Sequence, residues 1–200
     1  PILVLAGDIP LITSSTLQSL LDTHLAEQNS ATVLTAQIND PEGYGRIVRD
    51  ENEGILRIVE ERDATEIERE ITEINSSVYV FNSHDLVDSL SKINNKNAQG
   101  EEYLTDAIGV LQSTGKRVEP VIVEDFIEIL GVNDRFQLSE CTALLRDRIN
   151  LHWMKNGVTM IDPTTVWIDP TVSLSQDVVI YPGVALAGDT SIESGVVIGA

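Results

Sequence analysis

The stretch from Val166 to Ala200 decides the fold of the C-terminal part of the chain. Cut every six residues, it reads VWIDPT, VSLSQD, VVIYPG, VALAGD, TSIESG and VVIGA. Position three of successive hexads is always Ile or Leu: Ile168, Leu174, Ile180, Leu186, Ile192 and Ile198. A period of six with Gly, Pro and Asp at the corners is typical of a parallel β-helix, in which each hexad forms one face of a three-sided coil. We therefore predict about two β-helical coils within residues 157–200.

A long helix is predicted immediately before these repeats, over about residues 134–155. Its apolar side is expected to consist of Leu138, Leu144, Leu145, Ile149 and Trp153. Asn156-Gly157 is a typical left-handed C-cap pair and marks its end. Residues 136–156 would thus form a linking helix between an N-terminal domain, 1–135, and the β-helix.

The N-terminal domain has the pattern of an α/β fold. The apolar run over 2–8 predicts a strand buried on both faces, and residues 31–38 predict a second strand. Between them, Thr13 offers an N-cap for a helix, which completes a βαβ unit. Further strands are expected at 46–49, 55–59, 77–81 and 117–123, with a polar turn at 50–54 and helices at about 83–94 and 103–114.

Charge and cysteine content exclude several classes of function. The net charge is −19, from 32 acidic against 13 basic residues, which disfavours nucleic-acid and anionic-membrane partners. Small phosphorylated substrates remain compatible if a divalent cation and a few bases are supplied locally. Cys141 is the only cysteine, so no internal disulfide can form, and we expect an inert, half-buried thiol in a reducing, cytoplasmic compartment.

Common catalytic motifs are missing from the sequence. His24, His84 and His152 share no metal-ligand spacing, which leaves zinc and a His-based triad without support. Neither a P-loop nor a G-x-S-x-G motif occurs. No apolar stretch approaches the roughly 20 residues that span a bilayer.

Two glycine-containing patches are candidates for ligand binding. In Ala6-Gly-Asp-Ile-Pro-Leu11, Asp8 follows a predicted strand and could hold Mg²⁺ through one oxygen; the alternative is an Asp that caps the next turn. In Gly43-Tyr-Gly-Arg-Ile47, a tight turn could bring backbone amides to a ligand, or it could simply enter a hairpin.

Polar residues near strand and helix ends form the remaining candidates. Glu60 and Asn75 could read sugar hydroxyls or an amide, although acidic residues in so acidic a chain are mostly solvated surface. Thr105 and Asp106 could cap a helix, and Asn133 could N-cap the long helix. Singly these patches are weak, so their order along the chain carries the argument.

Together the patches resemble the bifunctional N-acetylglucosamine-1-phosphate uridylyltransferase/glucosamine-1-phosphate acetyltransferase of bacteria, over essentially the whole chain. The matching pieces are Gly7-Asp-Ile-Pro-Leu11, Tyr44-Gly-Arg-Ile47, Val59-Glu60 with Asp63-Ala-Thr65, Glu73-Ile-Asn75, Asn97-Ala-Gln-Gly-Glu101, Tyr103-Leu-Thr-Asp106 and Gly131-Val-Asn133. A linking helix and a hexapeptide β-helix follow in the same order. The resemblance implies an α/β fold with a Rossmann-like mixed sheet, truncated at its N-terminus, and a left-handed β-helix.

The resemblance also implies residue roles. Asp8 and Asn133 would be the protein ligands of one or two catalytic Mg²⁺ ions. Ala6 and Gly7 would line the nucleotide side of the site. The sugar phosphate would be held by Gly45, Glu60, Asn75 and Thr105, and Asn133 would also contact the nucleotide sugar.

The reaction implied is uridylyl transfer from UTP to N-acetylglucosamine 1-phosphate, which yields UDP-N-acetylglucosamine for peptidoglycan and lipopolysaccharide synthesis. The same family acetylates glucosamine 1-phosphate with acetyl-CoA in later coils and assembles as a homotrimer. Phosphoryl-type transfer needs positioning and charge neutralisation more than a side-chain nucleophile, which suits these residue types.

The sequence departs from the family pattern in places. Ala6 stands where relatives often carry a larger residue, Ser76-Ser77 replaces Thr-Gly or Ser-Gly, and Glu102-Tyr103 replaces Tyr-Tyr. The family's Gly-rich triphosphate loop and its acetyltransferase residues have no counterpart between Pro1 and Ala200. We therefore expect an internal piece of a longer protein that catalyses neither step by itself.

Two alternatives stay open on the sequence. A glucose- or mannose-1-phosphate nucleotidyltransferase shares the fold and sometimes the β-helix, and Asn75 with the 97–101 segment favours N-acetylglucosamine 1-phosphate over these. A non-catalytic regulatory relative is the second, against which the presence of both Asp8 and Asn133 speaks.

Overall fold

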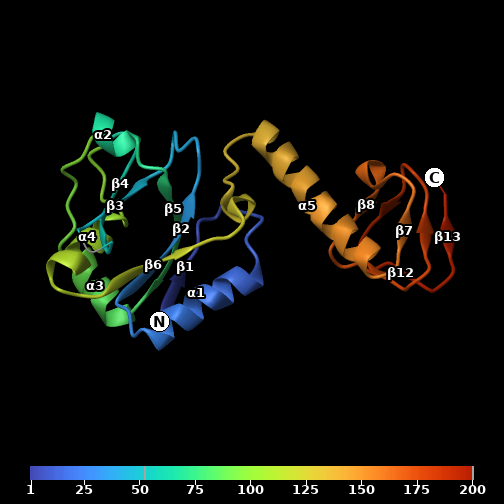
Figure 1. Ribbon diagram of the computed structural model, residues 1–200, viewed down its shortest axis with the longest axis horizontal. Helices are drawn as coiled ribbons and strands as arrows, with labels where there is room; N and C mark the ends of the chain where they lie inside the picture. Colours follow the sequence, from blue (N-terminus) through green and yellow to red (C-terminus); the bar gives the residue numbers. More distant parts are fainter. Residues whose placement is uncertain (52, 200) are drawn as a thin grey trace. The chain divides into compact units, whose positions relative to one another are not determined.

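The computed structural model describes residues 1–51 and 53–199 and divides into two compact units, Pro1–Gly131 and Val132–Ala200 (Figure 1). Asn52, within the predicted 50–54 turn, and Ala200, the last residue of the hexad pattern, lie outside the described residues.

The first unit is built on a mixed sheet. Its strands are β1 (Ile2–Val4), β2 (Ala31–Gln37), β3 (Arg46–Arg49), β4 (Ile55–Val59), β5 (Glu73–Phe81) and β6 (Val118–Ile122). They pair in the order β4-β3-β5-β2-β6, and β1 pairs with β5. Only β2 and β6 run parallel as neighbours; the other neighbouring pairs are antiparallel. The predicted α/β fold with a mixed sheet is confirmed.

Helices cover both faces of this sheet because the central strands alternate their apolar side chains between two cores. The helices are α1 (Ser14–Ala26), α2 (Glu66–Arg69), α3 (Ser83–Leu90) and α4 (Asp106–Ser113), with a 3-10 turn η1 (Phe126–Ile129). In β2, Val33 packs with Leu86 of α3 and Ile108 of α4, whereas Leu34 packs with Leu20 of α1. Each face therefore has its own core.

One expectation for the N-terminal segment was wrong. The first strand is not buried on both faces: Ile2 and Leu3 are 39% and 42% exposed. Among the described residues β1 pairs with β5 alone, which leaves its other edge uncovered. β1 and β2 run in the same direction, as the predicted βαβ unit requires, and antiparallel β5 lies between them.

Element boundaries in the first unit differ modestly from those predicted. The helices predicted over 83–94 and 103–114 are shorter, at 83–90 and 106–113, and β5 begins at Glu73 instead of 77. The short helix α2 was not predicted. It is stabilised by a capping box, in which Thr65 and Glu68 bond each other's backbone amides.

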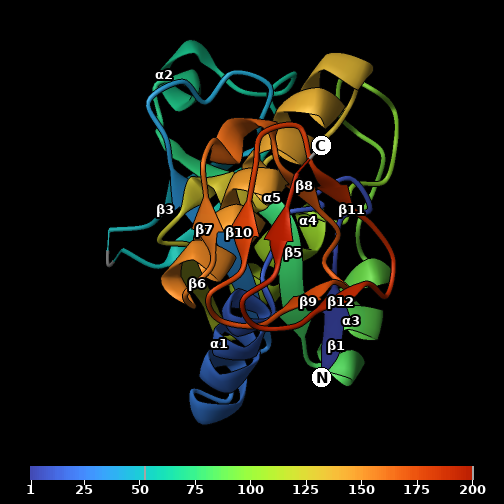
Figure 2. The same ribbon diagram turned by 90° about the vertical axis from the view of Figure 1, so that its right-hand side faces the viewer.

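The second unit combines the long helix with stacked short strands. It contains α5 (Arg135–Lys155), β7 (Thr159–Met160), a 3-10 turn η2 (Pro163–Thr165), β8 (Trp167–Ile168), β9 (Ser173–Leu174), β10 (Val179–Ile180), β11 (Ala185–Leu186), β12 (Ser191–Ile192) and β13 (Val197–Ile198). The strands pair in parallel, in the orders β13-β10-β7, β11-β8 and β12-β9 (Figure 2). The predicted period therefore yields three separate faces of short parallel strands.

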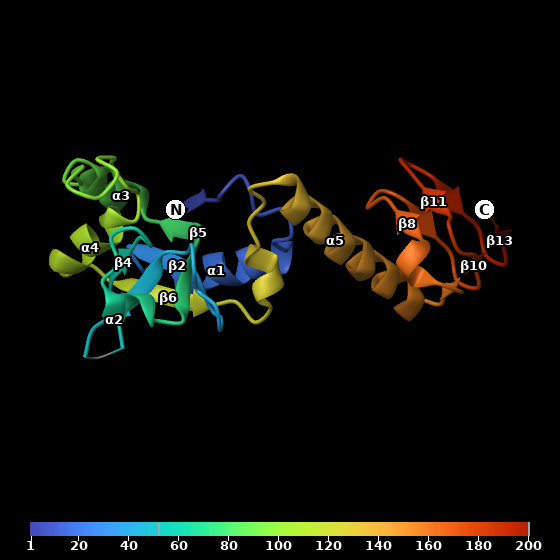
Figure 3. The ribbon, with the colours of Figure 1, turned by 90° about the horizontal axis from the view of Figure 1, so that it is seen from above.

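The hexad positions one and three fill the interior of this stack. Val166 and Val178 are fully buried, and Ile180 is likewise 0% exposed. The last turns of α5 pack against the same core through Ile149, Trp153 and Met154 (Figure 3). The C-terminal end of the helix therefore lies against the strands. Repetition at six residues places the same position in the core of every face.

The start of α5 departs from the predicted pattern. Leu138, assigned to the apolar side, is 51% exposed, whereas Cys141 and Asn150 are buried. Asp134, not Asn133, is the N-cap, and its side chain accepts the Gln137 amide proton at 2.8 Å. Burial raises the pKa of the Cys141 thiol, which disfavours the reactive thiolate, and the thiol is more deeply buried than expected.

No helix within the described residues is long and apolar enough to cross a membrane.

Candidate active site

Three of the predicted sugar-site residues lie side by side because neighbouring strands bring them together. Arg46 at the start of β3 pairs with Val59 of β4 and with Ile74 of β5. The adjoining residues Gly45, Glu60 and Asn75 therefore form the next row across the strands. The Asn75 amide donates to the Gly45 carbonyl at 2.8 Å.

Gly45 leaves little space for a side chain at this point. A Cβ there would lie 3.3 Å from Ile58 Cγ2, 3.4 Å from Glu60 Oε2 and 3.5 Å from the Asn75 Cβ. Glycine thus lets the backbone lie against both polar side chains.

Thr105 joins the same group from a distant segment. Its hydroxyl donates to Glu60 Oε1 at 2.9 Å, and the residue is only 6% exposed. Thr105 occupies the N-cap position of α4 but makes no side-chain capping bond, so the helix-cap interpretation of this residue is wrong. Its hydroxyl instead orients the Glu60 carboxylate.

Asn75 is oriented by Tyr79, whose position in the sequence indicates only a strand residue. Asn75 Nδ2 donates to the Tyr79 hydroxyl at 2.7 Å, and Asn75 Oδ1 accepts from the Ser77 amide at 3.2 Å. Burial strongly raises the pKa of Tyr79, while hydrogen bonds from Asn75 and Ser77 oppose that rise. Tyr79 is therefore neutral at every physiological pH and fixes the amide with a phenol.

Glu60, Tyr79 and Thr105 border a pocket, here called the Glu60 pocket. It has a volume of about 340 Å³ and is lined by Ala6, Glu60, Ser77, Tyr79 and Thr105, among others. The predicted nucleotide-side residue Ala6 and the sugar-side residues Glu60 and Thr105 therefore share one cavity. The pocket lining offers a carboxylate and several hydroxyls to a polar ligand.

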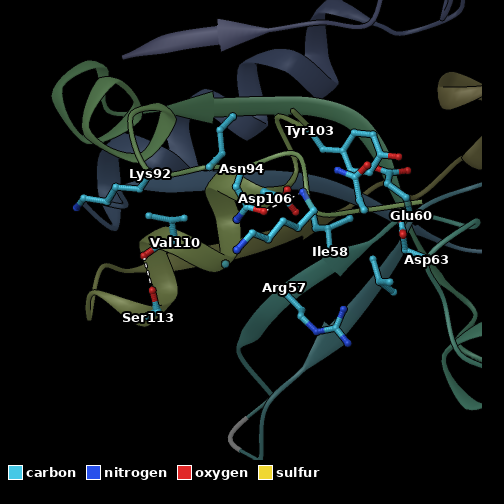
Figure 4. A pocket seen from close by; sticks show the side chains of 15 residues that line it. Arg57, Ile58, Glu60, Asp63, Lys92, Asn94, Tyr103, Asp106, Val110 and Ser113 are labelled. Atoms are coloured by element: carbon cyan, nitrogen blue, oxygen red, sulfur yellow. Dashed lines mark hydrogen bonds between the residues drawn. The ribbon is translucent and has the colours of Figure 1, made fainter. Parts of the chain in front are cut away.

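A second pocket of about 390 Å³ adjoins Glu60 on the side of α4 (Figure 4). Figure 4 shows Glu60 and Tyr103 at one end and Lys92 with Ser113 toward the other. Asp63 beside it accepts the Ala98 amide at 2.7 Å and so anchors the 97–101 loop. Burial raises the pKa of Asp106 in this pocket, and the negative charge of Asp63 raises it further.

Arg46 and Glu61 brace the loop that precedes Gly45. Arg46 is 2% exposed, and its guanidinium donates to Glu61 Oε2 at 2.7 Å and to the Tyr44 carbonyl. Glu61 also accepts the Gly43 amide at 3.3 Å. The Arg46 hydrogen bond lowers the pKa of Glu61. Sequence reasoning missed this pair because nothing local marks an arginine as buried.

Asp8 and Asn133 are both exposed. Asp8 lies beyond the end of β1, two residues after Ala6 of the Glu60 pocket, and its carboxylate has no partner among the described residues. Asn133 belongs to the other unit, where its amide donates to Gln137 Oε1 at 2.7 Å. Each offers a free side-chain oxygen, the donor type that Mg²⁺ prefers.

No group of three His, Cys, Asp or Glu side chains within residues 1–51 and 53–199 could hold a metal by itself. One carboxylate and one amide would leave most of the coordination sphere of a magnesium ion to phosphates and water, which is its usual arrangement at nucleotides. The donor chemistry of each of these two residues, taken by itself, suits that ion.

The mixed sheet and the polar pocket at its strand ends agree with the comparison to known families. A model of the nucleotidyl transferase family matches residues 1–169, and the chain belongs to that family. Within it, the chain is similar to the bifunctional protein GlmU of Clostridium beijerinckii, with 51% identity over 189 residues, covering 94% of this chain and 41% of the relative. The resemblance drawn from the motifs is thereby confirmed.

Other relatives with the same name agree. The bifunctional protein GlmU of Streptomyces coelicolor is 47% identical over 199 residues, 99% of this chain and 41% of its own length. That of Acetivibrio thermocellus is 50% identical over 181 residues, 90% of this chain and 39% of its own length. The chain thus spans about two fifths of the length of the curated relatives it matches.

Proposed function

We propose that this chain carries the sugar-phosphate side of a uridylyltransferase site, which joins UTP and N-acetylglucosamine 1-phosphate into UDP-N-acetylglucosamine. In this reaction a phosphate oxygen of the sugar phosphate attacks the α-phosphorus of UTP. A new phosphorus–oxygen bond forms, the bond to the β-phosphate breaks, and pyrophosphate leaves.

The main support is the convergence of Gly45, Glu60, Asn75 and Thr105 from four separate segments. Glu60, oriented by Thr105, would accept hydrogen bonds from sugar hydroxyls. Asn75, oriented by Tyr79, would bond the acetamido group, and Gly45 lets the backbone approach the ring. Held this way, the sugar phosphate is positioned for attack, which supplies much of the catalysis in phosphoryl transfer.

Asp8 and Asn133 would hold the magnesium, with Ala6 and Gly7 on the nucleotide side. Magnesium bound there would neutralise phosphate charge and bridge phosphate oxygens. The role of Asp8 is to supply the negative oxygen that retains the cation, and Asn133 adds a neutral one, which leaves the ion net positive toward the phosphates.

For the whole protein we propose the organisation of its bifunctional relatives. Residues 1–135 would belong to the uridylyltransferase domain, 136–156 to the linking helix, and 157–200 to a left-handed β-helix. The second activity would be acetylation of glucosamine 1-phosphate by acetyl-CoA, in a cytoplasmic homotrimer. The support is the similarity to GlmU proteins and the hexad period with its stacked parallel strands.

The test uses the full-length protein and measures pyrophosphate release from UTP with three sugar phosphates. N-Acetylglucosamine 1-phosphate should be used best. Glu60→Gln should raise the KM for that substrate about tenfold or more, because hydrogen bonds to a charged group are lost, and leave the KM for UTP unchanged. A preference for glucose or mannose 1-phosphate would contradict the proposed substrate.

Asp8→Asn should abolish turnover while the far-ultraviolet circular dichroism stays unchanged. Asp22→Asn, an exposed change on α1, is the matched control and should leave the rate unaltered. Near-normal rates in Asp8→Asn would refute the metal assignment. A wild-type protein without any nucleotidyl transfer would instead point to the non-catalytic relative.

A further inference from the structure

Strand β5 contains an irregularity at the Glu60 pocket. Along β2, Val33 pairs with Tyr79 and Thr35 pairs with Asn75. Leu34 alone therefore faces the three residues 76–78 of β5, so the ladder is interrupted there by a bulge. Bulges redirect side chains and are frequent beside active sites.

The bulge is stabilised by Ser76. Its hydroxyl donates to the Leu34 carbonyl at 2.6 Å and accepts the Val78 amide at 3.2 Å. One side chain thus satisfies backbone groups that the interrupted ladder leaves without partners. These two hydrogen bonds explain why Ser76 is buried, at 5% exposed, but they do not explain why a serine follows it at position 77.

Ser77 has a backbone conformation that favours glycine. Its φ is +60°, in the left-handed region where a Cβ is strained. Ser77 is exposed and lines the Glu60 pocket, between Asn75 and Tyr79. Strained residues that persist next to a pocket are candidates for a role in ligand binding.

The hydroxyl of Ser77 has capacity left for a ligand. The Ser77 amide is already taken by Asn75 Oδ1 at 3.2 Å, so the hydroxyl is the polar group of this side chain that faces the pocket. A hydroxyl has one donor and two acceptor positions, so it can bond a ligand and a neighbouring side chain at the same time. Asn75 hydrogen-bonds both Tyr79 and the Ser77 amide, so the three residues form one polar group, of which Ser77 is the exposed member.

We propose that Ser77 is a specificity-determining residue of the sugar-phosphate site and that its hydroxyl hydrogen-bonds a polar substituent of the bound sugar. The inference rests on the proposed function and adds a ligand contact to it. The backbone strain at this position is the cost of placing a side chain in the pocket where glycine would place none.

The test compares Ser77→Gly with Ser77→Ala in the full-length protein. Both remove the hydroxyl and should raise the KM for N-acetylglucosamine 1-phosphate about three- to tenfold, with the KM for UTP unchanged. Only the glycine relieves the strain, so only Ser77→Gly should also raise the Tm, by about 2–4 °C. Function and stability thus move in opposite directions in a single variant.

Gln28→Gly is the matched control. Gln28 has φ +53°, is exposed and follows the end of α1, away from the Glu60 pocket. Its replacement should raise the Tm by a similar amount and leave both KM values unchanged.

Glucose 1-phosphate, which lacks the acetamido group, identifies the substituent. If the KM rises only for N-acetylglucosamine 1-phosphate, the Ser77 hydroxyl bonds the acetamido group. If it rises equally for both substrates, the hydroxyl bonds a ring hydroxyl. Either result supports the proposal. Unchanged KM values in Ser77→Ala and Ser77→Gly, in a protein that is active as wild type, overturn this inference alone. A wild type that transfers no nucleotide overturns the proposed function and this inference together.

Discussion

The pair of Arg46 and Glu61 should respond asymmetrically to the removal of either partner. The Arg46 side chain is 2% exposed and that of Glu61 is 29% exposed, so the two charges are solvated to different extents. Without Glu61, Arg46 keeps only the Tyr44 carbonyl as acceptor, and its Nε is already buried with no partner in the described part of the chain. Without Arg46, Glu61 can turn to water and to Arg69, which lies 3.5 Å away.

The magnitudes follow from this difference. Glu61→Ala leaves a buried guanidinium without its carboxylate partner and should lower the free energy of unfolding by about 3 kcal/mol. This value is at the low end of the range for breaking a buried ion pair, because Glu61 is partly exposed to solvent. Arg46→Met fills a similar volume without a charge and should cost about 1 kcal/mol, mainly the lost bond to the Tyr44 carbonyl. The expected gap of about 2 kcal/mol corresponds to a factor of roughly 30 in the folded-to-unfolded ratio.

The assay must report on the first unit. Trp153 and Trp167 are the only tryptophans of this chain and both lie in the second unit, so amide hydrogen exchange of β3 and β5 is the suitable measurement. Glu27→Ala serves as control, because its 2.7 Å pair with Arg117 is about half exposed on both sides and should cost less than about 1 kcal/mol. If Arg46→Met costs as much as Glu61→Ala, or if both match the control, the burial argument fails.

Two further predictions concern titration and space. Burial lowers the pKa of His24 below 6.5, so the unfolded chain binds more protons; stability should be complete above pH 6.5 and fall as the pH decreases toward the folded-state pKa. Urea unfolding between pH 7.5 and 5 should show this loss, which His24→Gln should reduce and the exposed His84→Gln should not; equal slopes in all three proteins would contradict it. Gly45→Ala should raise the KM for the sugar phosphate several-fold, because the methyl group would press on two site residues. Gly109 lies inside α4, and a Cβ added there would be 3.7 Å from the nearest atom of another residue. Gly109→Ala should therefore raise the free energy of unfolding by up to about 1 kcal/mol and leave the KM unchanged.

Helix and strand types followed from local pattern, and errors arose where burial depends on distant partners. The apolar run at 2–8 is indistinguishable by sequence from a fully buried strand, yet β1 has one uncovered edge among the described residues. Leu138 has the spacing of a core residue in α5 but lies before the helix reaches the strands it packs against. The cap predicted at Thr105 failed because a tertiary hydrogen bond to Glu60 replaced the local one.

The sequence by itself determined the repeating C-terminal fold, because a period of six assigns the same residue to the core of every face without reference to anything distant. It also determined which donor types are available, such as the carboxylate of Asp8. Only the tertiary structure decided that Gly45, Glu60, Asn75 and Thr105 are neighbours, and that Ser77 lines the pocket beside Glu60. Strand pairing and bulges depend on contacts between residues far apart in the chain, and such contacts leave no periodic signal in any one segment.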